Sequence, residues 1–121
     1  MSEISPQTLG QSLQALLAEA FDGIPGESGS WFTESKRGQG IFGTIEGLTA
    51  AQASKQPAVG HASIAAHVEH MRFSLSLSNR WAKGEEPYNG ADWSAAWKKN
   101  AVSESEWKQL LADIRTEYSN W

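Results

Sequence analysis

Apolar residues recur at helical spacing most densely between residues 63 and 81, a stretch without Gly or Pro. On a helical wheel, where successive residues lie about 100° apart, the apolar residues form two adjacent stripes: Ile64, Val68, Met71 and Leu75, and beside them Phe73, Leu77 and Trp81. The polar residues share the remaining arc: Glu69, Arg72, Ser76, Asn79 and Arg80. An apolar arc this wide, roughly 220°, predicts a central helix over residues 62–82 that packs against neighbours on two sides.

The same spacing predicts two further long helices, over residues 6–22 and 104–120. Ser5-Pro6 suits the start of the first helix, and an apolar stripe follows it: Leu9, Leu13, Leu16, Leu17 and Ala20. Ser103 and Glu106 form a capping-box pattern before the last helix, and Thr49 with Gln52 forms another before a short helical turn at residues 50–55. The apolar stripe of the last helix consists of Trp107, Leu110, Leu111, Ile114, Tyr118 and Trp121.

Shorter helical pieces are expected near residues 41–55 and 92–98, the second holding Trp93 and Trp97 four residues apart. Residues 22–40 are rich in Gly and are the least regular region. Within them, the side chains of Trp31 and Phe32 are expected to pack against the core and hold the loop in place. The alternative is that these two side chains cover a pocket. No segment alternates as a half-buried strand does. The predicted fold class is therefore all-α, with three long helices plus short helical segments.

Length, charge and cysteine content narrow the classes of function. The 121 residues are expected to form a single domain, residues 1–121, with a real core. A formal net charge of −4 and the lack of any Lys/Arg cluster argue against nucleic-acid binding. No apolar run reaches membrane-spanning length and no signal-peptide pattern begins the chain, so no membrane association and a cytoplasmic location are expected. The absence of Cys removes thiolate metal sites and nucleophilic cysteine chemistry.

His67 and His70 are the main functional hint, because they lie one helical turn apart on the rim between the two stripes. Two interpretations are open. Each imidazole is a packing residue with one nitrogen hydrogen-bonded, or one or both supply neutral nitrogens to a metal ion. Two ligands do not close a metal site, so further carboxylates or water would have to complete it. The remaining histidine, His61, precedes the helix, and His67 is expected to be more buried than His61.

Two longer motifs carry a resemblance to a known family. Residues 47–53 read GLTAAQA and residues 63–70 read SIAAHVEH, and further matches follow at Gly84-Glu85, Asp92-Trp93, Glu106-Trp107 and Leu110-Leu111. With these motifs, residues 43–118 resemble the DinB-like superfamily. The resemblance implies an antiparallel four-helix bundle of the up-down-down-up type with a long crossover. It also implies a site for a divalent metal ion, often zinc or nickel, made by three histidines.

In that family pattern the first histidine lies early in the second long helix and corresponds to His67. The other two lie four residues apart on a final helix, and this sequence has no histidine after His70. His70 therefore inherits no fixed role from the resemblance. The expectation is either an incomplete version of a longer protein or a reduced branch that has lost its metal function.

Two functions remain open, and the residues do not decide whether the chain is an enzyme. The first is a metal-dependent enzyme that acts on a small molecule, of the thiol-dependent transferase or isomerase type, with His67 as a metal ligand and His70 as a second ligand or an acid/base group. The second is a non-catalytic bundle that acts through self-association or partner binding, with structural histidines. A homodimer is expected because three long helices leave an apolar groove. The competing account is a monomer in which Trp31-Phe32 and the Trp93/Trp97 segment cover that groove.

Overall fold

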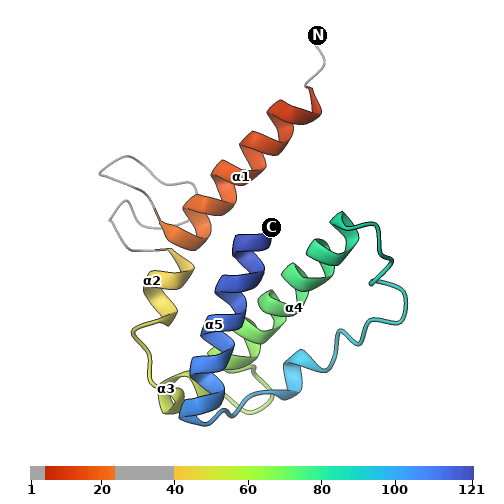
Figure 1. Cartoon of the computed structure of the whole chain (residues 1–121). Helices are drawn as coiled ribbons and strands as arrows, with labels where there is room; N and C mark the ends of the chain where they lie inside the picture. The colour runs from red at the N-terminus through yellow and green to blue at the C-terminus, as the bar shows by residue number, and fades with distance from the viewer. Residues whose placement is uncertain (1–4, 24–39) are drawn as a thin grey trace. The chain divides into compact units, whose positions relative to one another are not determined.

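The computed structural model describes residues 5–23 and 40–121, and within these ranges it contains helices and no strand (Figure 1). This confirms the all-α class. The elements are α1 (Pro6–Asp22), α2 (Ile41–Ile45), α3 (Ala50–Ser54), α4 (Ile64–Ala82), a single 3₁₀ turn η1 (Ala96–Lys98) and α5 (Glu104–Asn120). The predicted bounds of the first and last helices are confirmed, and α4 begins two residues later than expected. Trp31 and Phe32 lie outside the described residues.

The chain divides into two compact units, residues 1–47 and 48–121, which are described here one at a time. The prediction of a single domain stays a prediction. In the described part of the first unit, the Ser5 side chain caps α1 by accepting a hydrogen bond from the Thr8 amide at 3.1 Å. The rings of Phe21 and Phe42 lie 5.4 Å apart and both are buried. A Cβ atom at Gly40 would collide with the backbone of Phe21 and Gly23, so only glycine permits this close approach.

The apolar stripe predicted for α1 is largely exposed. Leu9, Leu13 and Leu16 keep 52%, 45% and 37% of their surface accessible, and Phe21 is the buried residue of the helix. These leucines are therefore not part of the core of the first unit. The physical reason is local: within its own unit, α1 contacts the five-residue helix α2, which is too short to cover four turns.

The second unit is built around α4 and α5, which run in the same direction and are joined by the crossover of residues 83–103 (Figure 1). Asn79 near the end of α4 bonds to Glu117 near the end of α5, and Glu69 and Leu110, both earlier in their helices, line one cavity. In an up-down-down-up bundle the two middle helices are parallel and are joined by a long crossover, and α4 and α5 have this relationship.

Hydrogen bonds tie the start of each helix in this unit to a distant segment. Ser63 caps α4 and also bonds to Asn100, donating its amide at 2.9 Å and its hydroxyl at 2.8 Å. The Glu104 carboxylate accepts the Ala50 amide at 3.0 Å, and the Trp107 indole donates to the Leu48 carbonyl at 3.0 Å. Both predicted capping boxes, at Thr49 and Ser103, are present. The crossover, α3, α4 and α5 are thereby held at one end of the unit.

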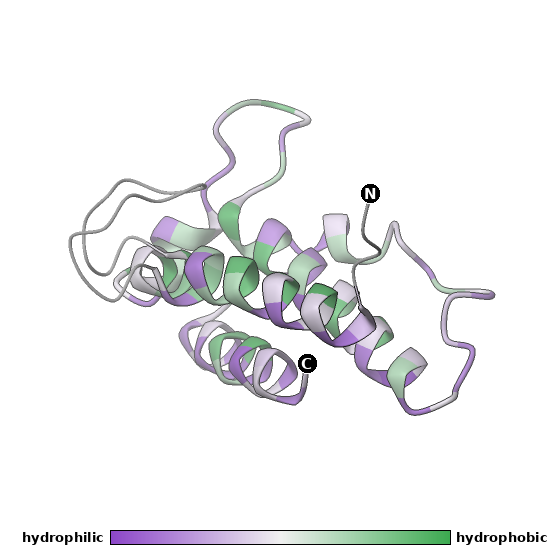
Figure 2. Cartoon of the chain, turned by 90° about the horizontal axis from the view of Figure 1, so that it is seen from above, coloured by the Kyte–Doolittle hydropathy of each residue, from purple (hydrophilic) through white to green (hydrophobic). Residues whose placement is uncertain are grey.

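The burial pattern of α4 differs from the predicted wheel. Glu69 and Asn79 are buried at 7% and 6% exposure, whereas Ile64 and Trp81 are exposed at 41% and 57%. The assignment of Glu69 and Asn79 to a solvent-facing arc is wrong because α5 packs on that side and polar partners satisfy both side chains. On α5 the buried residues are Trp107, Leu110 and Ile114, while Leu111 is only half-buried. Figure 2 shows apolar and polar residues alternating around the helix that ends at the C-terminus.

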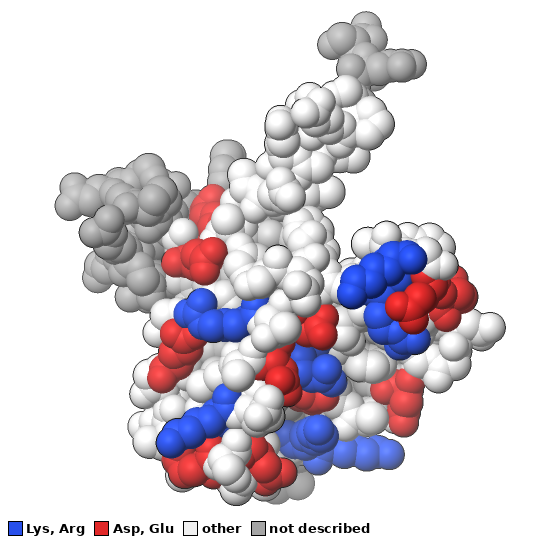
Figure 3. Space-filling view, in the orientation of Figure 1, with Lys and Arg blue, Asp and Glu red and all other residues white. Residues whose placement is uncertain are grey.

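Charge is distributed without a single-sign patch on the face seen in Figure 3, where acidic and basic side chains lie interspersed. This mixture of signs agrees with the modest formal net charge of −4. In the part of the chain that the structure describes, none of the helices has the length and apolar character needed to cross a bilayer.

Candidate histidine–tryptophan site

The first turns of α4 present His67 and His70 toward the crossover, and Trp97 of η1 contacts both. The Trp97 ring meets His67 edge-on, with centroids 5.1 Å apart and an interplanar angle of 82°. It stacks on His70 at 4.4 Å and 22°. The pair predicted from spacing thus does share one partner, because residues one turn apart on a helix project from the same side.

Three further rings continue this surface along α4. Trp93 lies 5.4 Å from Phe73 at 79° and 6.0 Å from His70 at 51°. Tyr88 stacks on Trp93 at 6.5 Å and 16°. We call the set the aromatic–histidine face: His67, His70, Phe73, Tyr88, Trp93 and Trp97. Tyr88, Trp93 and Trp97 remain 39%, 41% and 38% exposed, so the outer side of the face is open to solvent.

The turn that carries Trp93 is set by its neighbour Asp92. One Asp92 carboxylate oxygen accepts both the Ser94 hydroxyl at 2.6 Å and the Ser94 amide at 3.1 Å. These hydrogen bonds hold the pKa of Asp92 below its ordinary value. The predicted helical segment 92–98 is shorter in the structure, since turns precede the 3₁₀ helix Ala96–Lys98.

The two histidines differ in burial. His67 is exposed, as His61 is, and His70 is half-buried. His67 thus falls in the same exposed class as His61, with which it was compared, and His70 is the more buried histidine of α4. Nδ1 of His70 is inaccessible to solvent and has no hydrogen-bond partner among the described residues. Buried imidazole nitrogens normally have a partner, so this atom calls for an explanation such as a bound ion or water.

A metal site fits these residues only in part. A neutral imidazole nitrogen is a suitable zinc or nickel ligand, and the unpartnered Nδ1 of His70 is such an atom. Residues 5–23 and 40–121, however, contain no group of three or more His, Asp or Glu side chains arranged to hold a metal ion. They supply two candidate ligands, His67 and His70, and do not complete a site.

Sequence reasoning missed two features of this region. It placed Trp93 and Trp97 together on one helix face but did not connect them with the histidines. The sequence did contain a signal for this contact: two aromatic residues at i, i+4 and two histidines at i, i+3 can each present their rings on one side of a helical segment. It also missed the ion pair of Glu69 and Arg72 on another side of α4, which an i, i+3 opposite-charge spacing would have suggested.

A protein-family model now gives the class of protein that this fold defines. The model of the DinB superfamily matches residues 37–121. The chain belongs to the DinB superfamily, as the motifs at residues 47–53 and 63–70 indicated. No curated protein and no solved structure matches the chain.

Proposed function

We propose that this protein binds a divalent metal ion, zinc or nickel, through His70 and His67 and acts on a small molecule at the aromatic–histidine face. The observation that supports the proposal is the buried, unpartnered Nδ1 of His70. A buried polar nitrogen without a hydrogen bond costs about 1–3 kcal/mol. Coordination to a metal ion would offset that cost, and membership of the DinB superfamily makes a metal the expected ligand.

The residues around His70 have separable roles in this proposal. Stacking against Trp97 at 4.4 Å fixes the plane of the His70 ring, as a positioning partner of a ligand must. His67 is exposed and meets Trp97 edge-on, which leaves it free to act as a second ligand or as an acid/base group. Trp93 and Tyr88 form an apolar wall for part of a small molecule.

A bound metal ion would supply a Lewis acid to an oxygen or sulfur atom of the substrate. The reaction class we propose is the one that the family resemblance implies, a thiol-dependent transfer or isomerisation. The additional ligands that a closed site requires are not among the described residues.

Metal content tests this proposal directly. Protein purified without an affinity tag is analysed for metals, and Zn²⁺ and Ni²⁺ are titrated calorimetrically into wild type, His70→Ala, His67→Ala and His61→Ala. We expect stoichiometric metal, a loss of affinity of at least about tenfold for His70→Ala, a smaller loss for His67→Ala, and no change for the exposed control His61→Ala. Absence of metal binding, or equal affinity in all four proteins, would contradict the proposal.

A second candidate is a non-catalytic bundle that acts through self-association, with the histidines as packing residues. The specific observation in its favour is that Trp97 engages both imidazole rings while the described residues offer no third ligand. Exposed Trp81, Trp93 and Trp97 provide apolar surface for a second copy. This candidate predicts metal-free protein that sediments as a homodimer at micromolar concentration. Metal-loaded protein with a monomer mass would exclude it and support the first candidate.

A further inference from the structure

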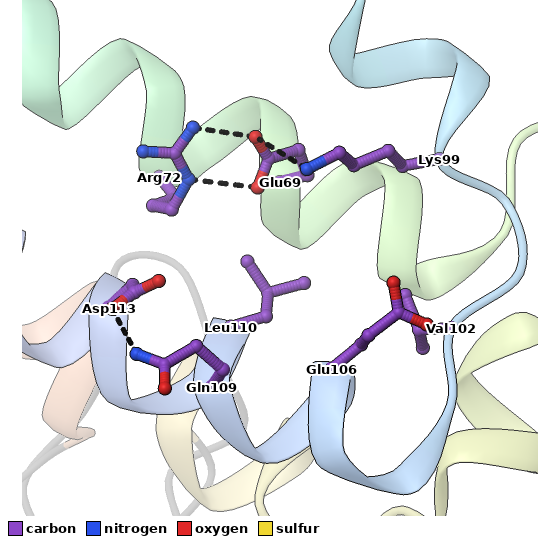
Figure 4. Close-up of a pocket in the computed structure, with 8 residues that line it drawn as sticks. All are labelled: Glu69, Arg72, Lys99, Val102, Glu106, Gln109, Leu110 and Asp113. Carbon is purple, nitrogen blue, oxygen red and sulfur yellow. Dashed lines mark hydrogen bonds and ion pairs between the residues drawn. The ribbon is translucent and has the colours of Figure 1, made fainter.

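A cavity lies between α4 and α5, and neither His67 nor His70 lines it (Figure 4). Its volume is about 260 Å³. That volume is slightly below the range usual for drug-sized ligands and suits a smaller molecule. The polar side chains around it come from three segments: Glu69 and Arg72 from α4, Lys99 from the crossover, and Glu106, Gln109 and Asp113 from α5.

The α4 wall of the cavity carries a buried ion pair. Both oxygens of Glu69 are engaged by Arg72, at 2.6 and 2.8 Å, and Lys99 Nζ lies 3.9 Å from one of them. Burial alone would raise the pKa of Glu69, but the hydrogen bonds and charge of Arg72, with the charge of Lys99, hold that pKa below its ordinary value. Glu69 faces two cations, Arg72 and Lys99, so this wall has one positive charge in excess. Lys99 is the more exposed of the two cations, and its charge also acts on Glu106.

The α5 wall carries the opposite charge. Asp113 uses one oxygen to accept the Gln109 amide at 2.8 Å, and Glu106 uses one oxygen to accept the Ser103 amide at 2.9 Å in the capping box. The second oxygen of Asp113 has no hydrogen bond among the described residues, whereas the Ser103 side chain and the charge of Lys99 also act on Glu106 and hold its pKa below the ordinary value. In Figure 4, Asp113 and Gln109 lie below Arg72 and Glu69. Lys99 extends from the right toward Glu69, at the top of the view.

A small space with an ammonium group on one wall and two carboxylates on the other is complementary to a molecule that carries both charges. We propose that the α4–α5 cavity binds a small zwitterion of the amino-acid class, with its carboxylate at Lys99 and its ammonium group at Asp113 and Glu106. This site is independent of the metal proposed at the aromatic–histidine face.

The test compares three probes of matched size on the full chain: L-alanine, propionate, which lacks the ammonium group, and ethylammonium, which lacks the carboxylate. Binding is followed by amide chemical shifts in ¹H–¹⁵N spectra at low salt, where screening is weakest. We expect L-alanine to bind about tenfold or more tightly than either single-charge probe, with shifts centred on Glu69, Arg72 and Asp113. Lys99→Gln and Asp113→Asn should each weaken L-alanine binding about tenfold, the effect of losing one good charged contact.

Lys98→Gln is the matched control, because Lys98 is exposed, neighbours Lys99 and does not line the cavity. It should leave the affinity for L-alanine unchanged. The proposal is overturned if L-alanine does not bind at millimolar concentration, if it binds no better than propionate or ethylammonium, or if Lys98→Gln weakens binding as much as Lys99→Gln. Shifts centred on His67 and His70 instead of the cavity would also overturn it, without bearing on the metal measured by elemental analysis.

Discussion

Two sides of α4 are stabilised by different kinds of contact. Toward α5, the side chains of Glu69 and Asn79 are buried and hydrogen-bonded, and Asn79 donates to the Glu117 carbonyl at 2.7 Å and to its carboxylate at 2.9 Å. Toward the crossover, the contacts are between rings, and the partner rings Trp93 and Trp97 stay about two-fifths exposed. The first side fixes how two helices align, and the second covers histidines with aromatic surface.

This difference indicates that the contacts toward α5 contribute more to the free energy of unfolding than the contacts toward the crossover. Buried hydrogen-bonded groups accept few alternative partners, so the α5 side specifies one helix register. Ring contacts at the surface tolerate small shifts and bury less area per residue. We therefore expect substitutions on the α5 side to lower the free energy of unfolding strongly and those on the crossover side to change local structure and ligand binding with little loss of stability.

The largest effect is expected for Trp107→Ala, which tests the anchor of the α5 side. Trp107 is 1% exposed and its indole donates to the Leu48 carbonyl. Removing it should lower the free energy of unfolding by about 4 kcal/mol, measured by urea denaturation. Trp81→Ala, at a site 57% exposed, is the control and should cost about 0.5 kcal/mol. Equal losses of unfolding free energy for the two variants would show that the difference in burial does not determine how much each tryptophan stabilises the fold.

Glu69→Gln should cost about 3 kcal/mol, because it leaves Arg72 without its charge partner in a partly buried position. Replacing both residues, as Glu69→Gln with Arg72→Met, should restore part of that loss. A double variant less stable than the single one would contradict the assignment of the cost to an unpaired charge.

The same pair predicts a pH dependence of stability. Since the pKa of Glu69 in the folded protein lies below its ordinary value of 4.5, the pair's contribution is present above pH 4.5 and is lost as the pH falls through the folded-state pKa. Urea midpoints measured at pH 7 and at successively lower pH below 4.5 should therefore fall more steeply for wild type than for Glu69→Gln. Parallel curves for the two proteins would remove Glu69 as a source of this dependence.

Leu75→Ala and Leu111→Ala sharpen the comparison within the apolar stripes. Both leucines were expected at the centre of an apolar stripe; Leu75 is buried, at 9% exposure, whereas Leu111 is only half-buried. We expect losses of about 3 kcal/mol for Leu75→Ala and about 1 kcal/mol for Leu111→Ala by urea denaturation. A larger loss for Leu111→Ala than for Leu75→Ala would mean that α5 buries a different face from the one described.

Only a small loss of stability is expected from removing a ring on the crossover side. Trp97→Ala should cost about 1 kcal/mol, yet it should change the near-ultraviolet circular dichroism, which reports fixed aromatic packing. Trp97→Phe keeps a ring over His67 and His70 and should keep more of that signal. A loss as large as that of Trp107→Ala would show that the aromatic–histidine face is part of the core.

Much of the local structure could be predicted from the sequence because it depends on residues close in the chain. Ser5-Pro6, Ser103 with Glu106 and Thr49 with Gln52 act within one helical turn, and the structure contains all three caps. The candidate site was predicted less completely. The spacing of His67 and His70 predicted a shared side of α4, but their partner Trp97 lies about thirty residues along the chain, and no local pattern links the two segments.

The sequence by itself determined that this protein is helical, where its long helices lie and that its motifs are those of the DinB superfamily. Only the tertiary structure decided which sides of those helices are buried, because the wheel ranks residues by polarity and carries no information about partners. Glu69 and Asn79 are polar and still buried, since Arg72 and Glu117 satisfy them where α5 packs. Trp81 is apolar and still exposed. The free energy of burying a side chain is set by the groups that meet it, and those groups are assembled only by the fold.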